Sequence, residues 1–308
     1  MTDTSKHVIT YGTGASTTVV HDLGRGRFRW QRSAGTSTTG SLTLAPLEVL
    51  AAAVSASDER VRFTVAEQNE SGLTYELPSP VSLGWWLLNG EILPDEAVDA
   101  VRAVGAAVRR LHRTPPPPGF RTRPELVVEL ADWMDAGSGR AETQFFHSTT
   151  GERLGGLRWE LLRDWAADVL APAGPAVLTH GALVPNTVVA SEDRARVELL
   201  TGTQLCLAPP AYDIGTFLAD LAGMRSLVRF GVANGAPPLG DLTVLAGALL
   251  DGYGGSPDPE TVGRVICVAY LDRLRGYTAH LGWTDFLLQE LDRVAALIDS
   301  GGRDWENV

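Results

Sequence analysis

The pattern of apolar residues changes near residue 80, and this change constrains the fold more than any single motif does. Before it, short runs rich in β-branched and aromatic residues alternate with glycine-containing turns, which is typical of strands. These runs lie at 7–11, 17–23, 27–33, 61–66 and 73–77, with one short helix after Pro46. After residue 80, apolar residues recur at helical spacing, as in Val98, Val101, Val104, Val108 and Leu111. The order predicts an α+β chain with two unequal lobes.

We expect residues 1–79 to form a small N-terminal lobe, an antiparallel sheet with one helix. Residues 80–308 should form a larger C-terminal lobe that is mostly helical, and a hinge near Glu76–Pro80 should join the two. A short strand-rich insert interrupts the helical pattern at 176–180, 187–190 and 196–200. A chain of 308 residues is long enough for two such lobes, at roughly 150 residues per domain.

The charge of the chain excludes several classes of partner. With 37 acidic and 26 basic residues, the net charge is −11, which disfavours nonspecific binding to nucleic acid or to anionic membranes. No apolar run reaches the ~18 residues of a membrane span, and the first residues lack a signal-peptide core. Cys206 and Cys267 are too few for a disulfide framework. We therefore expect a cytoplasmic protein with no nucleic-acid or membrane partner.

Lys6 is the only lysine, so nearly all the positive charge is carried by arginine. Any chemistry that requires an ammonium group in the protein interior therefore has no candidate beyond Lys6.

Three blocks of the C-terminal half share a recognisable pattern. They read LTHGALVPNTVVA at 178–190, VELLTGTQ at 197–204 and APPAYDIGTFLADL at 208–221. The blocks resemble the aminoglycoside phosphotransferase and choline kinase superfamily, because His180-Gly181, Pro185 and Asp213 match positions of its motifs. Its members typically read H-G-D-L-x-P-x-N-V-L, then I-D-W or I-D-F, then G-D-P-x-Y-D-L. The preceding segment VRRLHRTPPPPGF at 108–120 is also similar, and the resemblance implies a bilobal protein-kinase-like fold.

The resemblance implies ATP-dependent phosphoryl transfer, which is catalysed mainly by positioning and charge neutralisation. The family uses a loop Asp as general base, an Asn and a second Asp to hold Mg²⁺, and a lysine on the third strand paired to a helix Glu. In this chain the base position is Ala182 and the two metal positions are Thr187 and Thr201. The lysine position falls near Gln31, with Arg29 and Arg32 close by. Because all four positions differ from the family pattern, the sequence predicts a pseudokinase without a confident catalytic residue, cofactor or metal site.

Other residues of the pattern have two interpretations each. His180 and Asp213 match the family; we expect His180 to be a packed residue that organises the loop and Asp213 to brace that loop. Asn186 lies one position before the metal position and would hold a metal only if the loop register slipped by one residue.

Weak candidates for nucleotide contacts lie in the N-terminal half. Glu48 stands where the helix Glu would sit, although an exposed face or an arginine pair explains it as well. Gly12 and Gly14 could let backbone N–H groups approach a phosphate, although glycines between two strands are also typical of a hairpin turn.

These residues are consistent with two functions. The first is a binding or scaffold protein that holds a peptide, a metabolite or a partner enzyme in the cleft between the lobes, in specialised metabolism. The alternative is an unorthodox phosphotransferase that uses ATP and Mg²⁺. It would act on a hydroxyl of a small molecule, or on Ser or Thr of a precursor peptide with a lyase partner. Such an enzyme would recruit other carboxylates, for example Glu198 or Asp193, or a partner protein that completes its site.

Overall fold

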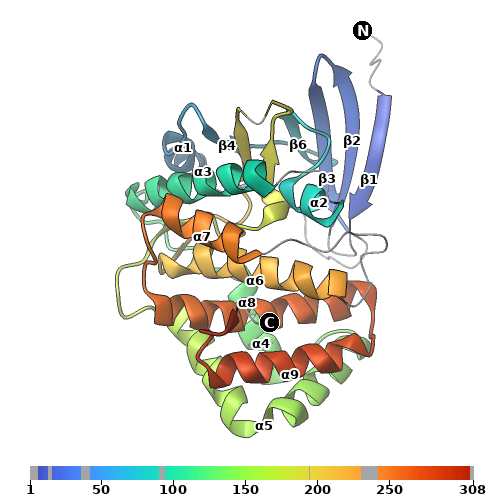
Figure 1. The fold of residues 1–308 in the computed structure, drawn as a ribbon, viewed down its shortest axis with the longest axis vertical. Helices are drawn as coiled ribbons and strands as arrows, with labels where there is room; N and C mark the ends of the chain where they lie inside the picture. Colours follow the sequence, from blue (N-terminus) through green and yellow to red (C-terminus); the bar gives the residue numbers. More distant parts are fainter. Residues whose placement is uncertain are drawn as a thin grey trace.

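The fold combines a small sheet region with a larger helical region, as the sequence pattern predicts (Figure 1). It was obtained as a computed structural model, which describes residues 6–12, 16–35, 42–89, 94–193, 195–229 and 242–305. In Figure 1 the long strands stand at the top, and the helices lie below them in stacked layers. The α+β prediction is therefore confirmed.

A five-stranded antiparallel sheet forms the N-terminal region. Its order is β1 (Lys6–Gly12), β2 (Ser16–Gly24), β3 (Arg27–Ala34), β6 (Gly72–Leu77) and β5 (Glu67–Asn69). Trp30 of β3 stands opposite Val20 on one side and Tyr75 on the other, and all three side chains are buried. This small core also contacts Val189 and Leu200 of the C-terminal region, so the two regions share apolar contacts.

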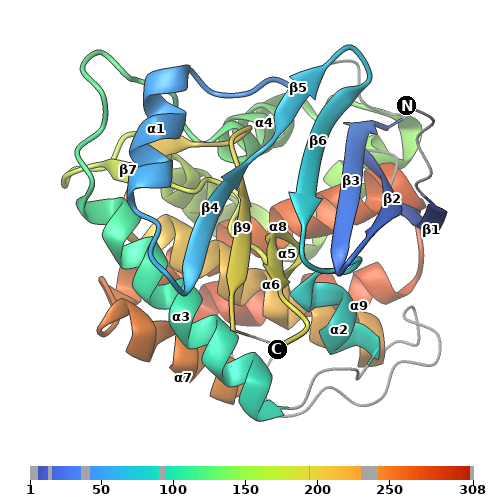
Figure 2. The same cartoon turned by 90° about the horizontal axis from the view of Figure 1, so that it is seen from above.

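One N-terminal strand differs from the expected antiparallel sheet. Strand β4 (Val61–Val65) pairs in parallel with β9 (Val197–Thr201), which pairs antiparallel with β8 (Val188–Ala190) (Figure 2). Strand β9 is buried along its whole length, so it needs a neighbour on each edge. Helix α1 (Leu47–Ser55) packs against β4, so this strand ties the first eighty residues to the rest of the chain.

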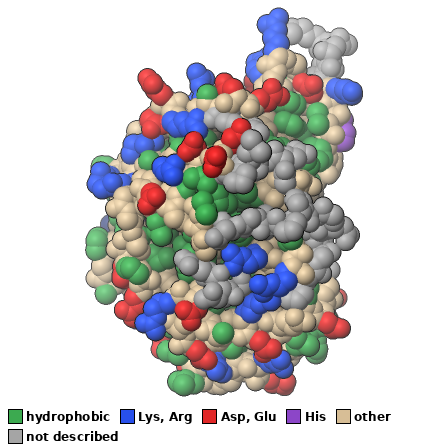
Figure 3. All heavy atoms as spheres, viewed as in Figure 1, with side chains coloured by type: hydrophobic (Ala, Val, Ile, Leu, Met, Phe, Trp, Pro, Cys, Tyr) green, Lys and Arg blue, Asp and Glu red, His purple; other side chains and the backbone are tan. Residues whose placement is uncertain are grey.

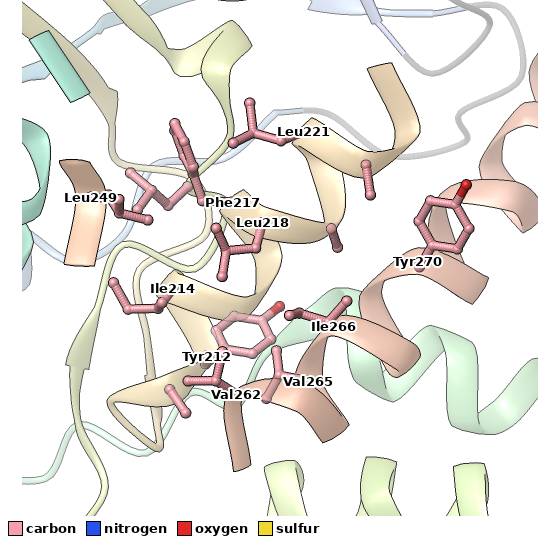
Figure 4. Close-up of a cluster of buried hydrophobic side chains, with 14 of the residues drawn as sticks. Tyr212, Ile214, Phe217, Leu218, Leu221, Leu249, Val262, Val265, Ile266 and Tyr270 are labelled. Carbon is pink, nitrogen blue, oxygen red and sulfur yellow. The ribbon is translucent and has the colours of Figure 1, made fainter. Parts of the chain in front are cut away.

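The helical region is built around α6 (Ala211–Arg229), which is buried on nearly every face. Figure 4 shows its side chains between α7 (Leu242–Tyr253) and α8 (Pro259–Leu281), with Phe217 and Leu249 on one side and Val265 on the other. The remaining helices are α2 (Leu83–Asn89), α3 (Pro94–Arg113), α4 (Glu125–Ala136), α5 (Ala141–Leu170) and α9 (Phe286–Asp299). Strands β7 (Val177–Thr179) and β10 (Cys206–Ala208) form a short antiparallel pair.

The described surface mixes charges of both signs. On the face drawn in Figure 3, Lys and Arg side chains lie among Asp and Glu side chains, so the acidic excess is not gathered in one area of that face. None of the helices in the described ranges is apolar over a length that would cross a membrane.

Candidate functional site

A cavity of 830 Å³ separates the sheet region from the helical region. Its upper wall includes Ser16, Arg32 and Tyr75 of the sheet, and its lower wall is formed by α4, α5, α8 and the loop after β7. Ionisable side chains of both signs line it: Arg32, Glu125, Glu129, Arg140, His180, Asp272, Arg275 and His280. This cleft is where the resemblance places the chemistry, so each predicted position can be located relative to it.

The loop from β7 to β8 brings two predicted positions to the cleft. Ala182 and Thr187 both line the cavity, and Ala182 offers no polar side-chain atom. The Thr187 hydroxyl is used within the loop: it accepts a hydrogen bond from the Val184 amide at 3.3 Å and donates to the Val184 carbonyl at 2.8 Å. Neither position therefore presents a free oxygen ligand to the cleft.

Thr201, at the end of β9, is turned into the protein. Its side chain is buried, and its hydroxyl donates to the Leu199 carbonyl at 2.9 Å. Its neighbours Leu200 and Gly202 line the cavity, but Thr201 does not. The second predicted metal position is therefore outside the cavity wall.

Asn186 lines the cleft but is tied to the start of α2. Its Oδ1 accepts a hydrogen bond from the Ser82 hydroxyl at 3.1 Å, and it lies so close to Gly84 that a Cβ there would require the Asn186 side chain to move. Both side chains are therefore engaged within the protein, Asn186 with Ser82 and Thr187 with its own loop.

His180 and Asp213 form a buried network beneath the loop. The Asp213 carboxylate accepts from the backbone amides of His180 at 2.8 Å and Gly181 at 3.0 Å, and from His112 Nε2 at 3.0 Å. His112 Nδ1 lies 3.0 Å from the Tyr253 hydroxyl. The role of His112 was missed in the sequence, although the Leu-His pair before the prolines was a signal for it.

The electrostatics of this network follow from burial and from its partners. Burial opposes ionisation of Asp213, but the hydrogen bond from His112, the electrostatic attraction of the neighbouring His112 and His180 imidazoles and the backbone amide of His180 outweigh it and lower the pKa of the carboxyl. His180 donates through Nε2 to the Leu200 carbonyl at 3.0 Å, and burial lowers the pKa of its imidazole. A neutral, packed His180 organises the loop and is a poor candidate for proton transfer.

On β3 the structure brings Arg32, and not Gln31, to the cleft. Side chains alternate along a strand, so Arg32 shares a face with the buried Trp30 while Gln31 points to the opposite face. The lysine position was expected near Gln31, with Arg29 and Arg32 close by; the cation that lines the cleft from this strand is the guanidinium of Arg32. A one-residue difference in register reverses the face of every side chain, and the segment RFRWQRS carries polar residues on both faces.

Two of the other N-terminal candidates, Glu48 and Gly12, do not line the cavity. Glu48 is exposed in the first turn of α1 and makes no ion pair with any residue in the described ranges. Gly12 pairs with Thr17 at the end of the β1–β2 hairpin, and Gly14 lies outside the described residues. The structure therefore gives neither Glu48 nor Gly12 a contact with the cleft.

The carboxylates of the cleft do not form a magnesium site. Glu129 and Asp272 share one guanidinium, Arg275, at 3.3 and 2.7 Å. No group of three or more His, Cys, Asp or Glu residues within the described ranges is arranged to hold a metal ion. Mg²⁺ in phosphoryl-transfer sites is usually held by one or two carboxylates together with substrate phosphates. The positions that the resemblance assigns to the ion are Thr187 and Thr201, which carry neither a carboxylate nor an amide and therefore do not fit it.

The two carboxylates that an unorthodox enzyme was expected to recruit, Glu198 and Asp193, lie outside the cleft. Glu198 on β9 is buried against Thr64 of β4, with Arg62 at 3.7 Å. Asp193 sits in an exposed turn, where it accepts from the Ser191 hydroxyl at 2.6 Å and the Ala195 amide at 3.0 Å. Neither lines the cleft.

Comparison with known proteins identifies what this architecture resembles. A family model described as the phosphotransferase enzyme family matches residues 50–248. The structure of a choline/ethanolamine kinase family protein from Mesorhizobium loti has a TM-score of 0.57 and 16% identity, covering 99% of this chain and 92% of that chain. Ethanolamine kinase from Plasmodium vivax has a TM-score of 0.55 and 12% identity, covering 97% and 85%.

An aminoglycoside phosphotransferase from Streptomyces rimosus has a TM-score of 0.51 and 16% identity, covering 88% of this chain and 93% of that chain. At such identities these structures show the fold alone. No curated protein sequence matches the chain.

Proposed function

Because this chain belongs to the phosphotransferase enzyme family, we propose that it keeps the family scaffold while phosphoryl transfer is lost or severely weakened. In this proposal it acts as a binding or scaffold component, and the cavity between the lobes holds a peptide, a metabolite or part of a partner enzyme. The setting we propose, on the resemblance alone, is specialised-metabolite biosynthesis.

The main support for the proposal is that the positions of the catalytic base and the metal ligands lack the required side chains. Ala182 has no polar side-chain atom, and the hydroxyls of Thr187 and Thr201 are hydrogen-bonded within their own segments. A triphosphate needs its charge neutralised by a divalent ion, and that ion needs carboxylate or amide oxygens. A positioned base alone contributes typically ~10²–10⁴ in rate. Together these losses leave transfer without its base and without its metal.

A second observation supports weak or absent nucleotide binding. The Trp30 indole, almost fully buried, donates to the Ser79 carbonyl at 2.9 Å in the connection between the lobes. In the same connection the Val81 amide donates to the Ser79 hydroxyl at 3.2 Å. None of residues 78–89, all of them described, lines the cavity. A flat base bound between the lobes would therefore find these backbone groups already used.

The test is a transfer assay with labelled ATP and Mg²⁺, together with thermal unfolding in the same mixture. We expect no label above a heat-denatured control on candidate hydroxyl acceptors. We also expect no rise in Tm with millimolar Mg²⁺–ATP, whereas a ligand at a hundredfold excess over Kd would add about 2.7 kcal/mol of stability. Label transfer well above the control would disprove the loss of activity.

The alternative remains an unorthodox phosphotransferase acting on a hydroxyl of a small molecule or of Ser or Thr in a precursor peptide. The observation in its favour is that Glu125, Glu129 and Asp272 all line the cleft. It predicts a Mg²⁺-dependent rise in Tm with ATP that is lost in Asp272→Asn, and that result would decide for it.

A further inference from the structure

A second, smaller cavity lies inside the helical region. It has a volume of 170 Å³ and is lined by α4, α6 and α8, together with Val169 of α5. Its wall is mostly apolar, with Leu130, Val265 and Val268 as examples. This cavity belongs to none of the positions that the phosphotransferase pattern assigns.

Two buried polar atoms in its wall have no hydrogen-bond partner in the described part of the chain. They are the Tyr212 hydroxyl and Oδ2 of Asp220, and both residues are at least 95% buried. Figure 4 shows the Tyr212 ring between α6 and α8, close to Val265 and Ile266. Burial, with smaller electrostatic contributions from Cys206, Asp272 and Asp213, raises the pKa of this phenol far above its usual range, so it stays protonated. An unpaired buried polar group costs about 1–3 kcal/mol, which is reason to ask what fills the space.

We propose that this cavity binds a small, mainly apolar molecule, about the size of one ring, that carries one hydroxyl or amino group. The apolar wall takes the body of the molecule, and the free Asp220 oxygen accepts the hydrogen bond of its head group. The other Asp220 oxygen is already paired with Arg273. An ionised carboxylate oxygen can only accept, so the head group has to be a donor.

The size of the cavity suits such a molecule better than water. A cavity of about 150 Å³ with apolar walls accommodates benzene. A buried water makes two to four hydrogen bonds. Tyr212 and Asp220 are about two helical turns apart along α6, and the wall that they share is mainly apolar. An amphipathic ligand satisfies the polar atom and the apolar wall together.

The cavity adjoins the cleft between the lobes. Leu126, Val184 and Asp272 line both spaces. Val184 belongs to the loop that carries Ala182 and Asn186, so a molecule held in the smaller cavity would contact the same loop from behind.

The test uses the intact chain without nucleotide or Mg²⁺, so its outcome does not depend on whether the protein transfers phosphate. Benzyl alcohol, benzylamine and toluene are titrated by calorimetry. We expect the alcohol or the amine to bind about tenfold more tightly than toluene, which has no hydrogen-bond donor. Whichever of the two binds identifies the head group. Asp220→Asn should remove this preference.

A cavity-filling variant shows whether the probes bind in this cavity or elsewhere on the protein. Ala269 of α8 lines the cavity and is half-buried, so Ala269→Leu should abolish binding while the protein remains folded. Ala295→Leu on α9 is the matched control, since Ala295 is also half-buried but lines neither cavity, and it should bind as the wild type does. Absence of binding by all three probes, equal binding of toluene, or unchanged binding to Ala269→Leu would each overturn the proposal.

Discussion

The loop after β7 and the buried network beneath it keep very different shares of the family pattern. In the network, Asp213 still accepts from two backbone amides and from His112, and every one of these groups is buried. In the loop, Ala182 and Thr187 face an open cavity and retain neither of the chemical groups that the resemblance implies. The difference teaches that the residues that hold the loop are required by folding, whereas the residues that would act on a substrate are not.

The largest loss of stability is expected when the buried network is disrupted by Asp213→Asn. The two backbone amides donate to different carboxylate oxygens, so the amide side chain can satisfy only one of them and faces the other with its own N–H groups. We expect a loss of about 3–5 kcal/mol in the free energy of unfolding, as for other buried pairs that lose one partner. Urea unfolding followed by circular dichroism measures it. A loss below about 1 kcal/mol, the size of one ordinary hydrogen bond, would mean that the network does not hold the loop.

Acidification should weaken the same network. Burial lowers the pKa of His180 below its ordinary value of about 6.5, so between that value and the lowered one the unfolded chain binds a proton that the folded chain does not. Stability is therefore complete above about pH 6.5 and falls as the pH drops below it, by about 1.4 kcal/mol per pH unit for this group.

The measurement is the urea midpoint at about pH 7.5 and about pH 5.5, on either side of the ordinary histidine pKa, for the wild type and for His180→Gln. We expect the variant to be less stable at the higher pH but to lose less on acidification. Burial, with the positive charges of Arg140 and Arg275, also lowers the pKa of His280, so part of the slope should persist in the variant. Equal slopes in the two proteins would show that His180 is not the buried neutral group.

A smaller effect is expected within the loop. Thr187→Val removes the hydroxyl that accepts from the Val184 amide and donates to its carbonyl, which should cost about 1 kcal/mol. Thr187→Ser keeps the hydroxyl and should unfold as the wild type does. The same urea titration measures both, and a valine variant with unchanged stability would mean that the hydroxyl is free for another role.

The general architecture was readable from the sequence, because periodicity reports local structure. Apolar spacing predicted the helix after Pro94 and the long helices of the C-terminal half. It could not predict that β4 leaves the first sheet to pair with β9, since these strands are more than a hundred residues apart and periodicity contains no pairing information. The helix α4 was also missed, because the apolar pattern of residues 125–136 follows directly on a proline-rich segment.

The site was predictable in its chemistry and not in its geometry. Motif spacing identified Ala182, Thr187 and Thr201 as departures from the family, and this needs no coordinates. The choice between Gln31 and Arg32 depended on the register of one strand, and the partner of Asp213 depended on how α3 packs against α6. The small cavity left no signal, because Tyr212 and Asp220 have the spacing of ordinary core residues on one helix face.

The smallest effect should come from restoring a carboxylate at the base position. Ala182 is half-buried and lines the cleft, so the aspartate of Ala182→Asp reaches solvent and should change the free energy of unfolding by less than about 0.5 kcal/mol. Transfer from labelled ATP should stay at the level of the wild type, because Thr187 and Thr201 still offer no metal ligand. If Ala182→Asp alone produced phosphoryl transfer, the missing base would be the only defect, and the loop would differ from an active one at that single residue. If instead Ala182→Asp destabilised the protein as much as Asp213→Asn, the residue at position 182 would also be required for folding. The distinction between a network required for folding and a loop that is not would then be wrong.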